Sequence, residues 1–167
     1  MKQNIFLRRA LAYLADIAIL FAVLGPAGFL VQQAIGYAPT TGPEIWGVLI
    51  LNFSIPVWIY FWLSDASRRG ATLGKRIFRI RVVGSDGRPP GPGRALARTA
   101  LKLLPWEMVH LSAFALSPDP DAFSVLQSIG LTVANVLMLV YLYEAFASHG
   151  RRSVHDRVAS TEISSAA

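Results

Sequence analysis

Apolar residues in this chain are gathered into four long blocks instead of recurring at a helix or strand period. The blocks cover residues 10–33, 45–63, 99–116 and 125–147. A helix needs about 20 residues, at ~1.5 Å each, to cross a hydrocarbon core of ~30 Å. The pattern therefore predicts an all-α membrane protein, a bundle of four transmembrane helices in a single domain covering residues 1–167. A cleaved signal peptide is not expected, because the first block is too long.

The third block is the weakest span, since it carries Lys102, Glu107 and His110. A glutamate in mid-membrane costs roughly 2.5–3.5 kcal/mol, which the apolar residues of this block only about balance. The distribution of charge favours the span all the same. With four spans, all 16 Lys and Arg residues fall on one side, in residues 1–9, 64–102 and 148–167. The other side then holds Glu44, Asp119 and Asp121 and no base.

Basic residues are retained on the cytoplasmic side of membrane proteins. We therefore expect both termini, a long loop over residues 64–98 and a tail over residues 148–167 to be cytoplasmic. The sequence has 53% hydrophobic and only 16% charged residues, yet its net charge is +6. The same bias accounts for this excess of basic residues. Nucleic-acid binding is not expected. No cysteine is present and the three histidines lack zinc-ligand spacing, so no metal, cofactor or disulfide is expected.

The cytoplasmic loop has a structure of its own. Residues 75–83 have the β-branched, roughly alternating composition of a strand, or of a short helix followed by a strand. Residues 85–87 supply a turn, and the Pro- and Gly-rich residues 88–93 are expected to break regular structure. Residues 161–163 of the tail favour a second strand beside residues 79–83. We expect a small β ribbon on the membrane surface, with its bases near anionic lipid headgroups.

Two parts of the chain resemble each other. When Thr72 is aligned with Ser153, Arg76 falls on Arg157 and Lys75 on Asp156. Each segment follows an apolar helix and precedes a strand-like run. Two parallel repeats would produce this pattern, and chance similarity over so short a match would as well.

Local signals mark two helix starts and one helix interior. Residues 41–44 and 124–127 both read as capping boxes, which open the second and fourth helices. Pro105 cannot donate a backbone hydrogen bond, so it frees the carbonyl of Leu101 inside the third helix.

Three ordered motifs resemble the RDD family of bacterial membrane proteins. They are Arg9 with Asp16 seven residues later, the run Gly-Ala-Thr-Leu-Gly-Lys ending at Lys75, and residues 155–161, which include Asp156. The resemblance covers about residues 6–163, and the Arg and two Asp of the family's name fall on Arg9, Asp16 and Asp156. It implies a protein of the bacterial cytoplasmic (inner) membrane. Transport of unidentified ligands has been proposed for the family, and some members are described as cation/proton antiporters.

The signature has a physical reading that does not depend on the family. Arg9 and Asp16 are about 700° of helix apart and so share one face. An acid inside a membrane helix must pair, protonate or face water. Asp16 is therefore either a proton- or cation-coupling site or a structural anchor. We expect the structural role, with Asp16 accepting from a base or a backbone turn and Asp156 clamping the tail through Arg9, Arg157 or Lys75.

Two functions remain open on the sequence. In the first, the protein moves a cation or proton, with Asp16, Glu107 and His110 as relays; a protomer this small would then need to form a homo-oligomer. In the second, it is a non-transporting scaffold or assembly factor whose basic loop recruits lipid or a protein. An enzyme is not expected and no catalytic residue is assigned. Residues 70–75 lack the spacing of a phosphate loop, and Ser153, His155 and Asp156 are too close in sequence to form a triad.

Overall fold

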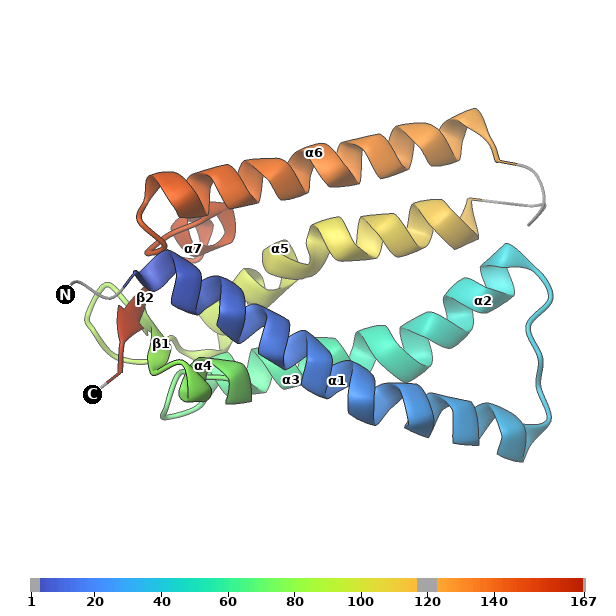
Figure 1. Ribbon diagram of the computed structural model, residues 1–167, viewed down its shortest axis with the longest axis horizontal. Helices are drawn as coiled ribbons and strands as arrows, with labels where there is room; N and C mark the ends of the chain where they lie inside the picture. Colours follow the sequence, from blue (N-terminus) through green and yellow to red (C-terminus); the bar gives the residue numbers. More distant parts are fainter. Residues whose placement is uncertain (1–3, 117–122, 167) are drawn as a thin grey trace.

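The computed structural model describes residues 4–116 and 123–166. It is an elongated bundle of helices with a small sheet at one end (Figure 1). The long elements are α1 (Ile5–Ile35), α2 (Gly42–Leu49), α3 (Ile55–Ala66), α5 (Pro92–His110) and α6 (Val125–Ala147). Two π-helical segments extend them: η1 (Ile50–Ser54) joins α2 to α3, and η2 (Leu111–Ala115) continues α5.

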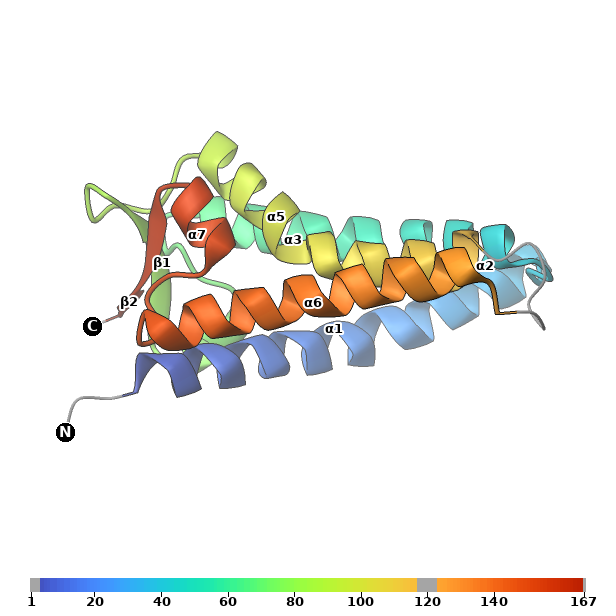
Figure 2. The ribbon, with the colours of Figure 1, turned by 90° about the horizontal axis from the view of Figure 1, so that it is seen from above.

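The short elements lie together at one end of the bundle, which we call the cap. They are α4 (Leu73–Ile77), β1 (Ile80–Gly84), α7 (Val154–Val158) and β2 (Thr161–Ser165). Both ends of the described chain lie beside them (Figure 1). Viewed from above, α1 and α6 run along one side of the bundle and α3 and α5 along the other (Figure 2).

Both predicted capping boxes are confirmed. The Thr41 hydroxyl accepts from the Glu44 amide at 3.4 Å, and the Glu44 carboxylate accepts from the Thr41 amide at 3.1 Å. Ser124 and Gln127 make the corresponding pair at the start of α6. As a result α6 has the predicted bounds, residues 125–147.

Three helices begin earlier than their predicted blocks, the second of them at Gly42, directly after its capping box. α1 starts at Ile5, not at residue 10, because Asn4 caps it and the helix continues into its polar end. The expectation that residues 88–93 break regular structure is wrong at its last two positions, because α5 starts at Pro92. A proline at the first helical position gives up no hydrogen bond and presets the helical φ.

Three helical stretches are long and apolar enough to cross a membrane: α1, Gly42–Ala66 and α6. The predicted third span falls on α5 and η2, whose charged residues set it apart. These segments nevertheless run alongside the other helices (Figure 1). The structure thus shows several apolar membrane helices, while the count of four spans remains a prediction. Asp119 and Asp121, which entered the charge argument, lie outside the described residues.

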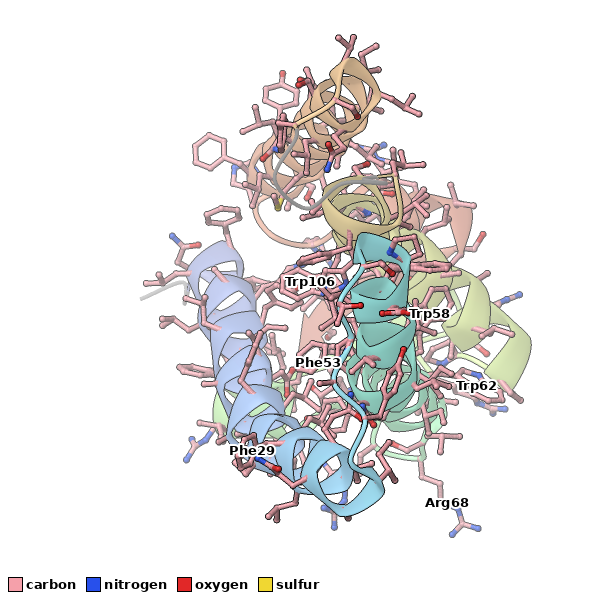
Figure 3. All side chains as sticks on the ribbon, turned by 90° about the vertical axis from the view of Figure 1, so that its right-hand side faces the viewer. Phe29, Phe53, Trp58, Trp62, Arg68 and Trp106 are labelled. Carbon is pink, nitrogen blue, oxygen red and sulfur yellow. The ribbon has the colours of Figure 1, made fainter. Side chains whose placement is uncertain are left out.

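The membrane part of the core is aromatic. The rings of Phe21 and Phe53 have centroids 4.7 Å apart, and Phe53 and Trp106 lie 6.3 Å apart. Figure 3, which looks along the bundle from the end opposite the cap, shows Phe53 and Trp106 between α1 and the α2–α3 helix, whereas Trp58 points away from α1. Many large apolar side chains on the outer faces of α1 and α6 are exposed. This is the surface expected of a helix that faces lipid.

The predicted ribbon is confirmed. β1 and β2 form an antiparallel pair in which Val82 lies opposite Ile163. Both of these side chains are fully buried, together with Ile80 and Ala12 of α1. The ribbon is therefore packed onto the cap end of α1.

The repeat suggested by the sequence is present in the cap. α7 begins and ends 81 positions after α4, and β2 begins and ends 81 positions after β1. The last residues of α3 and α6 are also 81 positions apart. Arg79 and Ser160 occupy equivalent places before the strands and have nearly the same left-handed φ, 51° and 52°. Each unit is thus an apolar helix, a short helix and a strand, and the two strands pair with each other.

Candidate functional site

A chain of buried ion pairs runs through the cap. Its members alternate in charge: Arg9, Asp156, Arg98, Asp65 and Lys75. Each comes from a different element, in order α1, α7, α5, α3 and α4. The side chains of the two aspartates are fully buried and Arg98 is 2% exposed. The ion-pair chain therefore joins five elements around one charged core.

Asp156 accepts more hydrogen bonds than Asp65, the other acid of the ion-pair chain. One carboxylate oxygen accepts from Arg9 at 2.6 Å and from the Ser153 amide at 3.0 Å, where it caps α7. The other accepts from Arg98 Nε at 2.8 Å and lies 3.4 Å from the Thr161 hydroxyl. Burial by itself would raise the pKa of Asp156, but the charges of Arg98 and Arg9 outweigh it and hold that pKa well below its usual value.

Of the three partners predicted for Asp156, only Arg9 is confirmed. Lys75 pairs with Asp65 instead, and burial lowers the pKa of Lys75 to about 8 although Asp65 acts in the opposite direction. Arg157 is on the exposed side of α7 and pairs with Glu144 at 2.8 Å. The second base on Asp156 is Arg98, which sequence reasoning missed.

Asp16 holds α4 against α1. One of its oxygens accepts from the Tyr60 hydroxyl at 2.6 Å and from the Gly74 amide at 2.8 Å. The other accepts from the Thr72 hydroxyl at 2.6 Å. The Thr72 hydroxyl in turn accepts from the amide of Lys75. The predicted backbone turn is confirmed as the partner of Asp16, and within the described residues no base contacts it.

A second polar site lies deeper in the bundle around Glu107. Its carboxylate accepts from the Ser54 hydroxyl and from Trp58 Nε1, both at 3.0 Å, and His110 Nδ1 lies 3.8 Å away. Both π-helical segments meet here, because Ser54 is the last residue of η1 and His110 directly precedes η2. π-Helical turns are often found at functional sites.

The structure brings Glu107 together with His110 but not with Asp16. Glu107 is bonded to α3 on the side where Trp58 points, whereas its neighbour Trp106 faces α1 (Figure 3). Asp16 is bonded to Tyr60 and to α4 in the cap. The predicted relay therefore consists of two separate polar sites, and no chain of hydrogen bonds among the described residues links them.

A cavity of about 210 Å³ lies between α1 and α6, and α5 forms its floor. We call it the α1–α6 groove. Its cap end is lined by Arg9, Arg98, Lys102 and His155, and its far end by apolar side chains that include Trp106 and Met138. Beside the groove, the carbonyl of Leu101 is the one that Pro105 was predicted to leave without a helical donor. It accepts from the Tyr141 hydroxyl at 2.9 Å. The groove thus has one charged end and one apolar end.

Sequence reasoning missed several residues of these sites, among them Arg98, Asp65, Tyr60 and Lys102. Arg98 was counted only as a base of the cytoplasmic loop, and Lys102 only as a base near the membrane surface. One signal was present. Arg98 and Lys102 are four residues apart and therefore share the inner face of α5, where a charge needs an acid or a ligand.

We expect acidification to weaken the fold through His155. Burial, aided by Arg98 and Arg9, keeps the pKa of His155 well below 6.5. The unfolded chain therefore takes up this proton first, and the free energy of unfolding falls by up to about 1.4 kcal/mol per pH unit below about pH 6.5. Thermal unfolding measured from pH 7.5 to 5 checks this. His155→Gln should flatten the dependence and His149→Gln, at an exposed position, should not; equal slopes in both variants would contradict it.

Comparison with known proteins agrees with the signature. No curated protein and no solved structure matches this chain. The family model described as "RDD family" matches residues 5–160, nearly the whole chain. This range contains the signature residues Arg9, Asp16 and Asp156 and every element of the cap except β2. The chain is a member of the RDD family of membrane proteins.

Proposed function

We propose that this protein is a non-transporting membrane scaffold whose rigid, basic cap recruits anionic lipid headgroups. The observation that carries the proposal is the use made of the signature residues. Arg9 and Asp156 are members of the buried ion-pair chain, and Asp16 is saturated by donors from α3 and α4. A coupling site needs an acid that can exchange its partner. The carboxylates of Asp16 and Asp156 instead bind donors that hold the cap together.

The outer surface of the cap carries the charge that would meet a lipid. Nine arginines are exposed: Arg68, Arg69, Arg76, Arg79, Arg88, Arg94, Arg151, Arg152 and Arg157. Three of them pair with Glu162 or Glu144. The other six have no acid partner in the part of the chain that the structure describes. Bases near an anionic leaflet gain about 1 kcal/mol each.

Lipid selectivity in nanodiscs tests this proposal. Spin-labelled phosphatidylglycerol should be retained at the protein several-fold over spin-labelled phosphatidylcholine, and added salt should reduce the preference. Changing the six unpaired arginines to glutamine should abolish it, while changing the same six to lysine should preserve it. A parent protein without preference, or an equal loss in both variants, would contradict the proposal.

The orientation with the cap in the cytoplasm is part of the proposal and rests on the charge distribution. Single cysteines can be placed freely because the chain has none of its own. In intact cells we expect cysteines at Thr40 and Pro120 to react with an impermeant maleimide, and cysteines at Gly91 and Ser165 to react only after lysis. Pro120 lies outside the described residues. Labelling of the cysteine at Ser165 before lysis would contradict this orientation.

Transport of a cation or proton by a homo-oligomer is the second candidate, and the Glu107 site favours it. An acid and a histidine one turn apart, between two π-helical segments, form a titratable pair at membrane depth. Proteoliposomes with a cation gradient and an internal pH dye decide the matter. Under the scaffold proposal the parent shows no flux. Flux that Glu107→Gln or Asp16→Asn removes, in protein as abundant and heat-stable as the parent, would establish transport instead.

A further inference from the structure

We propose that the α1–α6 groove binds one long-chain fatty acid, with its carboxylate at Lys102 and its acyl chain along α5 and α6. This inference goes beyond the recruitment of headgroups by exposed arginines. It concerns a different surface and a different part of the lipid, so either proposal can fail without the other.

The first argument is the balance of charge inside the cap. The ion-pair chain contains three bases and two acids, and Asp16 is a third acid nearby. Lys102 is a fourth base beside them, on the same face of α5 as Arg98. Each acid of this set already binds other donors: Asp156 four, Asp16 three, and Asp65 the bases Lys75 and Arg98. The set is therefore short of one negative charge, and the shortfall is at Lys102.

The surroundings of Lys102 show that the shortfall is local. Its ammonium lies 3.2 Å from the ring centroid of Phe61 and 4.8 Å from that of Tyr13. Within the described residues it has no ion pair and no hydrogen bond. Lys102 is only partly buried, so its ammonium faces the groove, and aromatic faces replace its hydration only in part. A bound carboxylate would supply the missing counter-charge.

A second donor at the same end of the groove also lacks an acceptor. Arg9 Nη2 lies 2.8 Å from His155 Nε2, and because a guanidinium can only donate, Nε2 must be the acceptor. The proton of the neutral ring is then on Nδ1. This atom is buried and has no partner among the described residues. Lys102 lines the groove without an acid, and the imidazole N–H beside it is buried without an acceptor, so this end of the groove is short of acceptors and suits an anion.

The shape of the groove indicates how large the anion can be. At the cap end α1 touches the turn after α6: Arg9 donates to the Gly150 carbonyl at 3.2 Å, and a side chain at Gly150 would lie 2.2 Å from the Phe6 amide nitrogen. The groove is therefore closed toward the cap surface. A phospholipid headgroup could not continue outward past this contact, whereas a carboxylate ends there.

The side of the groove is the route of access. α1 and α6 contact each other through the rings of Phe6 and Phe146, which pack edge to face with centroids 5.6 Å apart. The two helices then diverge, so that α5 is seen between them (Figure 1). The walls beyond Lys102 are apolar and include Trp106, Val109 and Met138. Because α1 and α6 are membrane helices, this opening faces acyl chains. A cavity of about 210 Å³ is below the ~300–1,000 Å³ of a usual ligand site, so it has room for part of one acyl chain and none for a second.

Binding of palmitate tests the inference with the full-length protein in phosphatidylcholine nanodiscs. A photoreactive, isotope-labelled palmitate should attach saturably at one per chain, on peptides containing Trp106 or Met138. Lys102→Met should weaken binding roughly thirtyfold or more, the usual loss for one partner of a buried charge pair. Arg152→Gln is the control, because Arg152 is exposed, pairs with Glu162 and lies outside both the groove and the six unpaired arginines; this variant should bind as the parent does.

Three further measurements remove alternative explanations. Lys102→Met should fold at least as well as the parent, because it deletes a charge without a counter-ion; a lower unfolding temperature would assign Lys102 to structure and overturn the proposal. Hexadecanol, which has the chain without the charge, should compete at least tenfold less well than palmitate. Equal competition by hexadecanol, or stronger competition by palmitoyl-lysophosphatidylglycerol, would overturn the assignment of a carboxylate at Lys102.

Discussion

Replacing Asp156 with alanine is expected to prevent recovery of folded protein from membranes. The substitution leaves Arg9 and Arg98 without their shared carboxylate in a core that already has an excess of bases. It also removes the cap of α7 at the Ser153 amide. Breaking one partner of a buried pair costs about 3–5 kcal/mol. Domains are typically stable by only about 5–15 kcal/mol, so the loss is a large share of the total.

The measurement is the amount of monodisperse protein after extraction and its unfolding temperature. Asp156→Asn should be nearly as damaging, because it keeps the shape but not the charge that Arg9 and Arg98 require. Asp86→Ala is the matched control: Asp86 is exposed and, among the residues that the structure describes, accepts only from the nearby Arg88 amide at 3.1 Å. It should change stability by less than about 1 kcal/mol. If Asp156→Ala behaved like Asp86→Ala, the ion-pair chain would not hold the cap.

The helices could be predicted closely where the sequence itself carries their end signals. Residues 125–147 were assigned correctly because Ser124 and Gln127 form a capping box directly before an apolar run. Apolar runs alone misplace helix ends, because a helix ends where its hydrogen bonds end and not where its apolar residues do. α1 therefore extends past Arg9 and Arg8 to Ile5, with Asn4 as its cap, and α5 extends past Arg98 to Pro92.

The charged residues could be identified from the sequence, but most of their partners could not. Positive-inside bias explains every base in the chain, and this explanation treated Arg98 and Lys102 as surface charges. In the structure Arg98 is nearly fully buried and pairs with Asp65 and with Asp156, which lie 33 and 58 positions away along the chain. Contacts at such separations follow from how the helices pack. The resemblance to the family grouped Arg9, Asp16 and Asp156 in advance, and the position of Asp16 inside an apolar helix marked it independently.

The run Gly-Ala-Thr-Leu-Gly-Lys at residues 70–75 shows how a motif can look like one site and serve another. Its spacing does not fit a phosphate loop. In the structure the Thr72 hydroxyl and the Gly74 amide do bind an anionic group, but that group is the carboxylate of Asp16 from the same chain. The small residues in this run allow α4 to approach α1 closely, and the donors at the start of α4 satisfy an acid inside a membrane helix.

Gly74→Ala is expected to separate α4 from α1. A Cβ atom at position 74 would lie 2.1 Å from the backbone oxygen of Ala12 and 2.9 Å from the carboxylate of Asp16. The first contact is with helix backbone, which cannot move aside as a side chain can. α4 must therefore shift, and the bonds from the Gly74 amide and the Thr72 hydroxyl to Asp16 are lost or stretched. Overpacking costs about 1–3 kcal/mol and an unsatisfied buried polar group about as much again.

We therefore expect Gly74→Ala to lower the free energy of unfolding by about 2–5 kcal/mol, measured as heat-stable protein in detergent. Gly93→Ala is the matched control, because it lies in the first turn of α5 and an added Cβ there meets nothing within 4 Å. Alanine in a helix is favoured over glycine by up to about 1 kcal/mol, so this variant should be as stable as the parent or more so. Gly74→Ala protein with the parent's stability would show that α4 can leave α1 without loss. Asp16 would then have to be explained by a function other than holding the cap.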